Sequence, residues 1–158
     1  PEELAGVLGH EWGHVVNRHS IRQLVSNLSA FVIVSAVLGD AGGITAVLVE
    51  NADAITRLSY SRNMESESDD YAIEVLHKNN LDPMGVSKSF TRLKESSKPI
   101  MIDSTEVSIP EFLTTHPDIE SRISTTKEAA QKKKTKVAVS PALQEIFDEL
   151  KEAVKETE

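Results

Sequence analysis

The sequence predicts a mainly α-helical fold, and three observations support this prediction. Apolar residues recur at helical spacing over most of the 158 residues, whereas few segments alternate polar and apolar residues as a half-buried strand does. Helix-start signals, Pro1-Glu2-Glu3 and Thr115-His116-Pro117, precede two of these stretches. Aromatic residues are only 4% of the chain, so aliphatic side chains must fill its core.

Length and composition narrow the function classes. The length suits one domain with a hydrophobic core rather than two. A formal net charge of −8, without a basic stripe interleaved with aromatic residues, argues against nucleic acid as a partner. The absence of cysteine excludes disulfides, thiolate nucleophiles and cysteine zinc sites. Because the chain opens on Pro1 without an initiator Met, we expect it to be a piece of a longer protein, with any signal peptide or anchor upstream.

The first half of the chain is predicted to contain three helical stretches. One helix runs from Pro1 to about Asn27, with an apolar stripe formed by Leu4, Val7, Leu8, Val15 and Val16. The apolar stretch 28–38 is interpreted as a buried helix or hairpin, with a membrane-dipping or lid segment as the alternative. It is well short of the roughly 18 apolar residues that a membrane span needs. Helix is again predicted over residues 44–79.

The second half is predicted to contain a short helix over residues 83–95 and a loop over residues 96–110. A further helix starts at Thr115-His116-Pro117-Asp118 and reaches about Gln131. We therefore assign residues 1–131 to the main domain, 132–141 to a solvated linker and 142–158 to a C-terminal amphipathic helix. The apolar side of this last helix carries Leu143, Ile146, Phe147, Leu150 and Val154.

The pattern His10-Glu11-Trp12-Gly13-His14 is the first candidate metal site. On a helix, the two histidines lie within roughly 40° of each other and one turn apart. Both imidazoles can then bind one ion at about 2.0–2.1 Å. Glu11 projects beside that face, where it can take a proton from a water on the metal instead of binding the metal. A pattern of five residues is also compatible with a chance motif on an amphipathic helix.

A catalytic zinc site usually needs a third protein ligand, and the remaining histidines are weak candidates. His19 follows His14 by five residues, about 140° around a continuous helix, so it is expected to point away as a surface or capping residue. His77 lies near a predicted helix end, where a structural role suits it.

The acidic cluster of residues 65–70 offers a better candidate. Glu65 and Asp69 share one helical face, while Glu67 points elsewhere. If Glu65 binds the metal, Asp69 can accept the free N–H of a ligating histidine and fix its orientation. A solvated acidic face is the alternative interpretation of the same residues.

Four segments, taken together, resemble a known family. "ELAGVLGHEWGHVVNRHS", "SRNMESESDDYAIEVL", "LDP" and "THPDIESRI" occur in the order seen in zinc metallopeptidases of the HtpX and BepA type, metallopeptidase family forty-eight. The resemblance covers about residues 3–123 and implies a gluzincin-type fold. Since the stretch 28–38 is too short for the long apolar spans of membrane-embedded members, the chain is nearer the soluble BepA-like branch.

The resemblance implies a zinc metalloendopeptidase with one zinc ion. His10 and His14 match the histidine ligands, Glu65 the third ligand, Glu11 the general base and Asp69 the last residue of the family's E-x-E-A-D stretch. His116 and Arg122 match a pair that lies beside the zinc in family members. That histidine approaches the substrate carbonyl, or binds the metal at rest in some members. Taken alone, His116 is a helix-start residue and Arg122 a surface residue.

Two departures from the family are visible. Ser68 replaces the usual Ala, a small-for-small change. The small β-sheet that normally precedes the motif helix, and whose edge strand pairs with the substrate backbone, is not in this chain and is expected on a missing upstream segment.

The implied partners are protein or peptide substrates, in envelope protein quality control. The implied location is periplasmic or membrane-associated, with membrane association through the missing segment. The alternative function is a zinc-clamped binding or chaperone module with little turnover, although intact Glu11 favours the enzyme.

Overall fold

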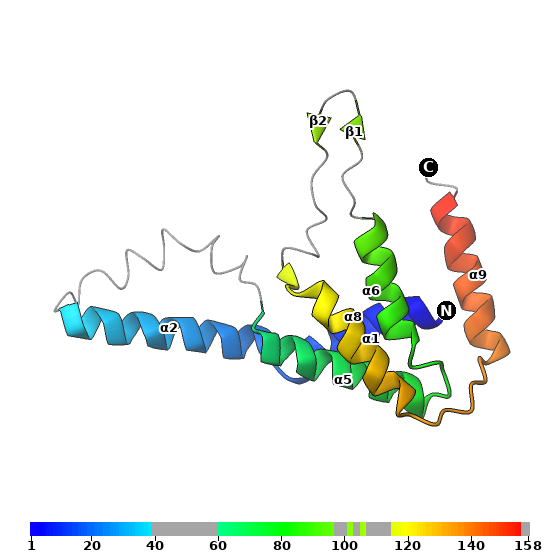
Figure 1. The fold of residues 1–158 in the computed structure, drawn as a ribbon, viewed down its shortest axis with the longest axis horizontal. Helices are drawn as coiled ribbons and strands as arrows, with labels where there is room; N and C mark the ends of the chain where they lie inside the picture. Colours follow the sequence, from blue (N-terminus) through cyan, green and yellow to red (C-terminus); the bar gives the residue numbers. More distant parts are fainter. Residues whose placement is uncertain (39–59, 97–100, 103–104, 107–114, 156–158) are drawn as a thin grey trace.

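The computed structural model describes residues 1–38, 60–96, 101–102, 105–106 and 115–155. In chain order its elements are α1 (Glu2–Val16), α2 (His19–Leu38), α5 (Arg62–Lys78), α6 (Gly85–Ser96), β1 (Met101–Ile102), β2 (Thr105–Glu106), α8 (Ile119–Gln131) and α9 (Pro141–Lys155). The predicted mainly α-helical fold is confirmed (Figure 1). β1 and β2 pair antiparallel, with Met101 opposite Glu106, so the interpretation of residues 96–110 as a plain loop is wrong there.

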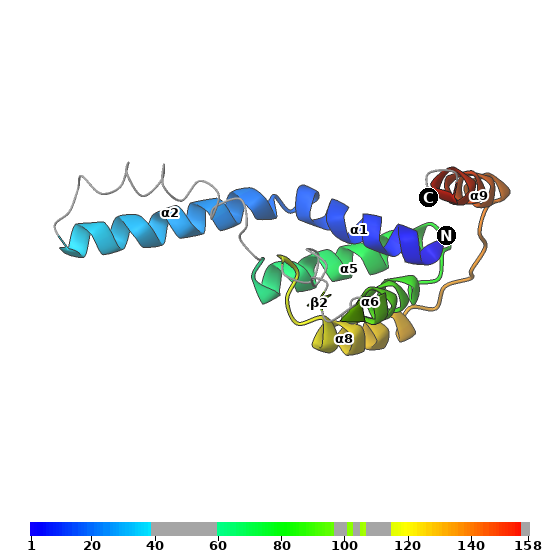
Figure 2. The same ribbon diagram turned by 90° about the horizontal axis from the view of Figure 1, so that it is seen from above.

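Four helices form the body that positions the site. α1 and α5 lie side by side, α6 packs against α1, and α8 packs against α6 and α5 (Figures 1 and 2). The apolar core lies where α5 and α6 meet, and it consists of Ala72, Ile73, Leu76, Leu81, Val86 and Phe90. The core is therefore at one end of the α1–α5 pair, and polar side chains fill the rest of the space between these helices.

The buried face of α1 is not its apolar stripe. Its buried residues are Gly6, Gly9, His10, Gly13 and His14, whereas Leu8, Trp12 and Val15 are each about 60% exposed. A Cβ atom at Gly13 would lie 2.8 Å from Ser68 Cα, so the two helices approach too closely for a larger residue. Glycine thus lets the α1 and α5 backbones approach and directs the two histidines between them.

The prediction of one continuous helix over residues 1–27 is wrong, because the first helix ends at Val16 and a second begins at His19. The Asn17 side-chain amide donates to the Gly13 carbonyl at 2.9 Å and ends α1. Arg18 then adopts a left-handed backbone with φ of 53°, and α2 starts at His19. A residue other than glycine in this conformation costs about 1–2 kcal/mol, so the surrounding contacts must hold the break in place.

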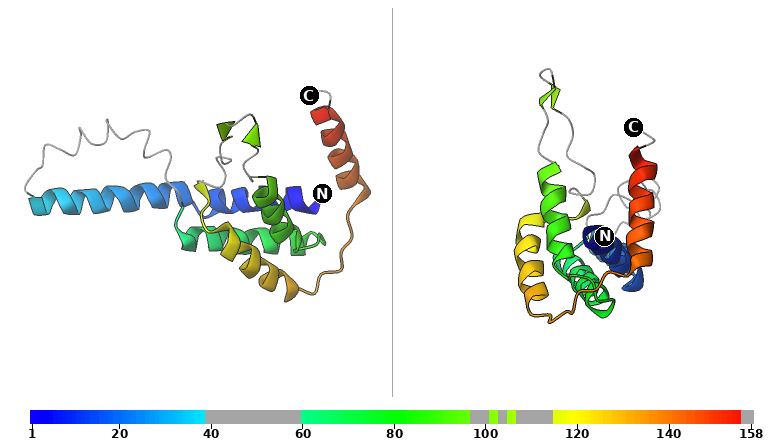
Figure 3. Two further views of the ribbon diagram at one scale, coloured as in Figure 1. Left: turned by 45° about the horizontal axis from the view of Figure 1, so that its top comes forward. Right: turned by 90° about the vertical axis from the view of Figure 1, so that its right-hand side faces the viewer.

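α2 extends away from the helical body (Figure 3). Val32 and Ile33 are 50% and 64% exposed, so the prediction that the stretch 28–38 is buried is wrong at these two residues. Among the described residues, no helix has the length and apolar character required to cross a membrane. The first part of the helix predicted over 44–79 lies outside the described residues.

The remaining helices follow the sequence prediction closely. α5 is capped by Ser61, whose hydroxyl accepts from the Met64 amide, and it ends at Lys78. α8 ends at Gln131, as predicted, but begins only after Asp118, whose φ is 60°. α9 presents Ile146, Leu150 and Val154 to solvent. The division into a domain, a linker and a C-terminal helix stays a prediction.

Candidate metal centre

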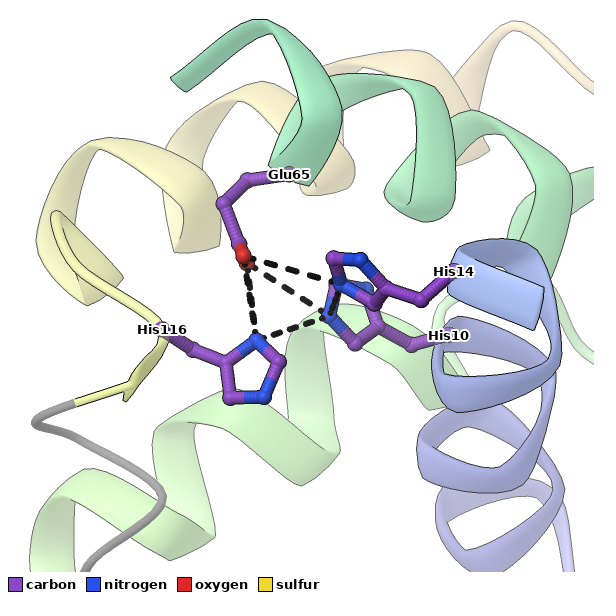
Figure 4. A group of neighbouring side chains, drawn as sticks. All are labelled: His10, His14, Glu65 and His116. Atoms are coloured by element: carbon purple, nitrogen blue, oxygen red, sulfur yellow. Dashed lines mark hydrogen bonds and ion pairs between the residues drawn. The ribbon is translucent and has the colours of Figure 1, made fainter. Parts of the chain in front are cut away.

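Four side chains from three parts of the chain converge between the helices. His10 and His14 come from α1, Glu65 from the first turn of α5, and His116 from the turn that precedes α8 (Figure 4). All four are buried, and each offers one donor atom within 4.8 Å of the donor atoms of the others. Segments 51 and 106 residues apart thus supply one compact group of donors.

The donor atoms surround a single point. His10 Nε2 lies 3.0 Å from His14 Nε2 and 3.3 Å from His116 Nδ1. The Glu65 carboxylate faces these nitrogens at 3.5 Å from His10 Nε2 and 3.6 Å from His14 Nε2. Two imidazole nitrogens and one carboxylate oxygen form a typical donor set of a catalytic zinc site, and His116 lies where a fourth group would bind. The residues present therefore fit a zinc ion.

Asp69 and Arg122 lie directly behind His10. Asp69 Oδ1 is 2.9 Å from His10 Nδ1, and Arg122 donates to both oxygens of Asp69 at 2.6 and 2.9 Å. Arg122 also forms an ion pair with Glu65. Because a carboxylate paired with arginine only accepts, His10 Nδ1 carries the proton and the Nε2 lone pair faces the centre.

The protonation states of His14 and Glu65 favour metal binding, whereas the raised pKa of His10 opposes it. Burial and the nearby His10 lower the pKa of His14 to about 3, so its imidazole is neutral near pH 7. Burial by itself would raise the pKa of Glu65, but hydrogen bonds with His10 and His116 and the charge of Arg122 lower it to about 2. Burial lowers the pKa of His10, but hydrogen bonds to Asp69 and Glu65 outweigh this effect and raise it. A neutral imidazole and an ionised carboxylate are the forms that bind a metal.

Glu11 lies on the open side of the centre. Its side chain is 47% exposed, and Oε1 is 3.6 Å from His116 Nε2. It borders a groove to which both α1 and α5 contribute residues, and which is lined mainly by Leu8, Trp12, His14, Tyr60 and Tyr71. Glu11 is absent from the converging donor group, and solvent reaches it.

The sequence did not reveal three further residues of the site. His19 was predicted to point away, but it is fully buried with Nδ1 2.9 Å from His14 Nδ1. The prediction assumed a continuous helix, in which His19 lies about 140° around the axis from His14. The helix instead ends at its C-cap residue, Asn17, and asparagine is a residue type that often ends helices and could have signalled the break. The Tyr60 ring stacks on His14 with centroids 4.0 Å apart, and Phe90 lies 4.4 Å beneath the Arg122 guanidinium. Neither aromatic residue belongs to a motif.

Two other sequence predictions concern residues near the centre. Glu67 stands outside the donor group, and its side chain is 43% exposed, as its helical position predicted. His77 lies 2.6 Å from the Thr135 hydroxyl near the end of α5, which agrees with the structural role predicted for it.

Residues 1–130 match the sequence model of Peptidase family M48. The chain belongs to this family of metallopeptidases. It is 35% identical to the metalloprotease YcaL of Escherichia coli K12 over 95 residues, which cover 58% of this chain and 37% of that protein. It is 31% identical to a putative β-barrel assembly-enhancing protease of Vibrio cholerae over 144 residues, which cover 82% of this chain and 28% of that protein.

A more distant relative is the mitochondrial metalloendopeptidase OMA1 of Saccharomyces cerevisiae. It is 29% identical over 120 residues, which cover 76% of this chain and 34% of that protein. The chain thus spans well under half the length of these relatives, and no solved structure matches it. The predicted resemblance to BepA-type peptidases is confirmed.

Proposed function

We propose that this chain carries the catalytic centre of a zinc-dependent metalloendopeptidase. The observation that supports it best is the convergence of His10, His14 and Glu65 beside the exposed carboxylate of Glu11. A zinc ion bound there would polarise the scissile carbonyl and lower the pKa of a water molecule to about 7. The chain's own residues then have to move the proton and hold the substrate.

Glu11 is the proposed general base. It accepts a proton from the attacking water and passes it to the amine of the leaving peptide. Its exposure and its position at the groove support this role, since solvent reaches this side of the centre and the groove offers room for a peptide. The apolar lining of the same groove suits the side chains of a protein or peptide substrate.

His116 and Arg122 are proposed to stabilise the oxyanion that develops on the scissile carbonyl. His116 Nε2 lies on the Glu11 side, which supports a direct contact with the substrate, while Nδ1 lies 3.1 Å from Glu65 and suits a fourth ligand in a resting state. The contacts of Arg122 with Asp69 and Glu65 support a role in orienting the ligands as well.

The biological setting is a further part of the proposal. The names of the β-barrel assembly-enhancing relatives suggest envelope protein quality control, in a periplasmic or membrane-associated location. Membrane association through an upstream segment belongs to the same proposal. A binding or chaperone module that keeps zinc as a structural clamp is the alternative, and the exposed base beside the ligands argues against it.

The proposed function is tested with Glu11→Gln in the full-length gene product. We expect zinc content near that of the parent and the loss of nearly all peptide cleavage, because the amide cannot accept the proton. Glu3→Gln, on the same helix but remote from the centre, is the matched control and should retain full activity. A Glu11→Gln variant that keeps a substantial share of the parent rate would falsify the assignment. A parent protein that binds zinc but cleaves nothing would favour the clamp.

A further inference from the structure

A chain of polar contacts runs from the back of His14 to the protein surface. His14 Nε2 faces the centre, and its other nitrogen, Nδ1, lies 2.9 Å from His19 Nδ1. His19 Nε2 lies 3.0 Å from Glu67 Oε2, and the same oxygen accepts from Arg22 Nη1 at 2.6 Å. His19 is fully buried, whereas Glu67 and Arg22 are each nearly half exposed.

The donor and the acceptor of each of these hydrogen bonds can be assigned, starting from Glu67 at the surface and moving inward to His14. Glu67 Oε2 accepts from Arg22 Nη1 at 2.6 Å, and a carboxylate paired with an arginine only accepts hydrogen bonds. His19 Nε2 must therefore donate, and in a neutral imidazole this leaves Nδ1 as an acceptor. His14 Nδ1 must then donate to His19 Nδ1.

This order fixes the state of His14. With its proton on Nδ1, the Nε2 lone pair points toward His10 Nε2 and the Glu65 carboxylate. The opposite tautomer would place a proton between the two Nε2 atoms and obstruct a metal ion. Ser68, which stands where the family usually has Ala, lies with Oγ 3.3 Å from His19 Nδ1, where its hydroxyl can donate and helps to keep this nitrogen an acceptor.

We infer that His19 is a positioning residue of the metal centre, which sets the tautomer and ring orientation of His14 and is itself held by Glu67 and Arg22. This inference rests on the proposed zinc centre and assigns no new ligand to it. The left-handed backbone of Arg18 is what turns His19 back toward His14. Outer groups of this kind raise the basicity of a ligand and fix its orientation, and their loss typically costs about 10- to 100-fold in metal affinity.

Two substitutions separate this role from simple packing. His19→Phe keeps the ring volume but removes both nitrogens, whereas His19→Asn is smaller but keeps an oxygen acceptor near the position of Nδ1. If His19 orients His14, zinc affinity measured by chelator competition should fall about 10- to 100-fold in His19→Phe. It should largely recover in His19→Asn. A packing role predicts the reverse order, because Asn leaves a cavity that Phe fills.

A second measurement uses the parent protein and does not depend on how the variants fold. Nitrogen-15 NMR of labelled histidines should show the proton of His14 on Nδ1 in both the metal-free and the zinc-bound protein. A proton on Nε2, or a His19→Phe variant that binds zinc as tightly as the parent, would overturn the inference. A parent protein that binds no zinc would overturn the proposed function itself, so the two failures are distinguishable.

Discussion

His10 and His14 lie one helical turn apart and face the same point, yet different structures support them. His10 donates directly to Asp69, which is buried and paired with the buried Arg122. His14 is linked through His19 to Glu67, which is partly exposed and paired with Arg22 at the surface. We call these two sets of contacts the supports of His10 and His14. Each support ends in a carboxylate of α5 and an arginine, but only the support of His10 is buried.

The difference shows how carboxylates of one helix, α5, can orient both His10 and His14. Asp69 lies on the face of α5 that meets α1, so it reaches His10 without an intermediary. Glu67, two residues earlier, lies off that face and does not contact His14 directly. The His19 side chain lies between them and contacts both. Removing one partner of a buried ion pair leaves an uncompensated charge, whereas water can replace an exposed partner. We therefore expect the buried support to carry more of the stability and of the metal affinity.

The largest effect is expected from Asp69→Asn. It breaks the direct support of His10 and leaves the Arg122 charge with Glu65 as its remaining carboxylate. Zinc affinity should fall about 10- to 100-fold, and the free energy of unfolding in urea should fall by about 3 kcal/mol. Asp70→Asn, at the next position and outside the donor group, should change little. A small effect of Asp69→Asn on both quantities would remove the basis of the comparison.

A smaller effect, shared by both supports, is expected from Gly13→Ala. The new methyl group would lie 2.8 Å from Ser68 Cα and push α1 away from α5. Alanine raises helix propensity by about 1 kcal/mol, and overpacking costs about 1–3 kcal/mol, so we expect a modest net loss of stability in thermal unfolding. Zinc affinity should fall with it, because α1 carries both histidines and α5 carries Glu65. Trp12→Ala, on the exposed face of α1, is the control. A stabilised Gly13→Ala variant would show that the close contact is not limiting.

The sequence predicted those parts of the site that depend on spacing within one helix. His10 and His14 are neighbours because they are four apart in α1, and Glu65 and Asp69 are neighbours for the same reason in α5. That these two pairs meet, and that His116 joins them, depends on packing between distant segments. The residues alone offered Glu65 only as a candidate ligand beside a solvated acidic face, and the family resemblance was needed to indicate the meeting with His116.

The errors have a common cause in local backbone geometry and close packing. His19 was misplaced because the angle of a continuous helix does not hold across a left-handed residue, here Arg18. The apolar stripe of α1 predicted the helix but not its buried face, because glycines rather than large apolar side chains allow the closest approach to α5. Neither effect changes the apolar pattern from which the helices were predicted.

The smallest effect is expected from Glu67→Gln, which removes the charge at the outer end of the His14 support. Exposed ion pairs contribute about 0.2–1 kcal/mol, so zinc affinity should fall by no more than about fivefold. Salt should reproduce this loss, because charges in contact with solvent are screened within about 8 Å at physiological ionic strength. We therefore expect raised salt to weaken zinc binding slightly in the parent and hardly at all in Glu67→Gln. Arg22→Gln is the matched control at the other end of the same ion pair. Glu67→Gln could instead lose as much zinc affinity as Asp69→Asn. Solvent exposure would then not determine how much each support contributes to zinc affinity, and the imidazole of His19 would transmit the effect of the carboxylate charge as effectively as direct contact does.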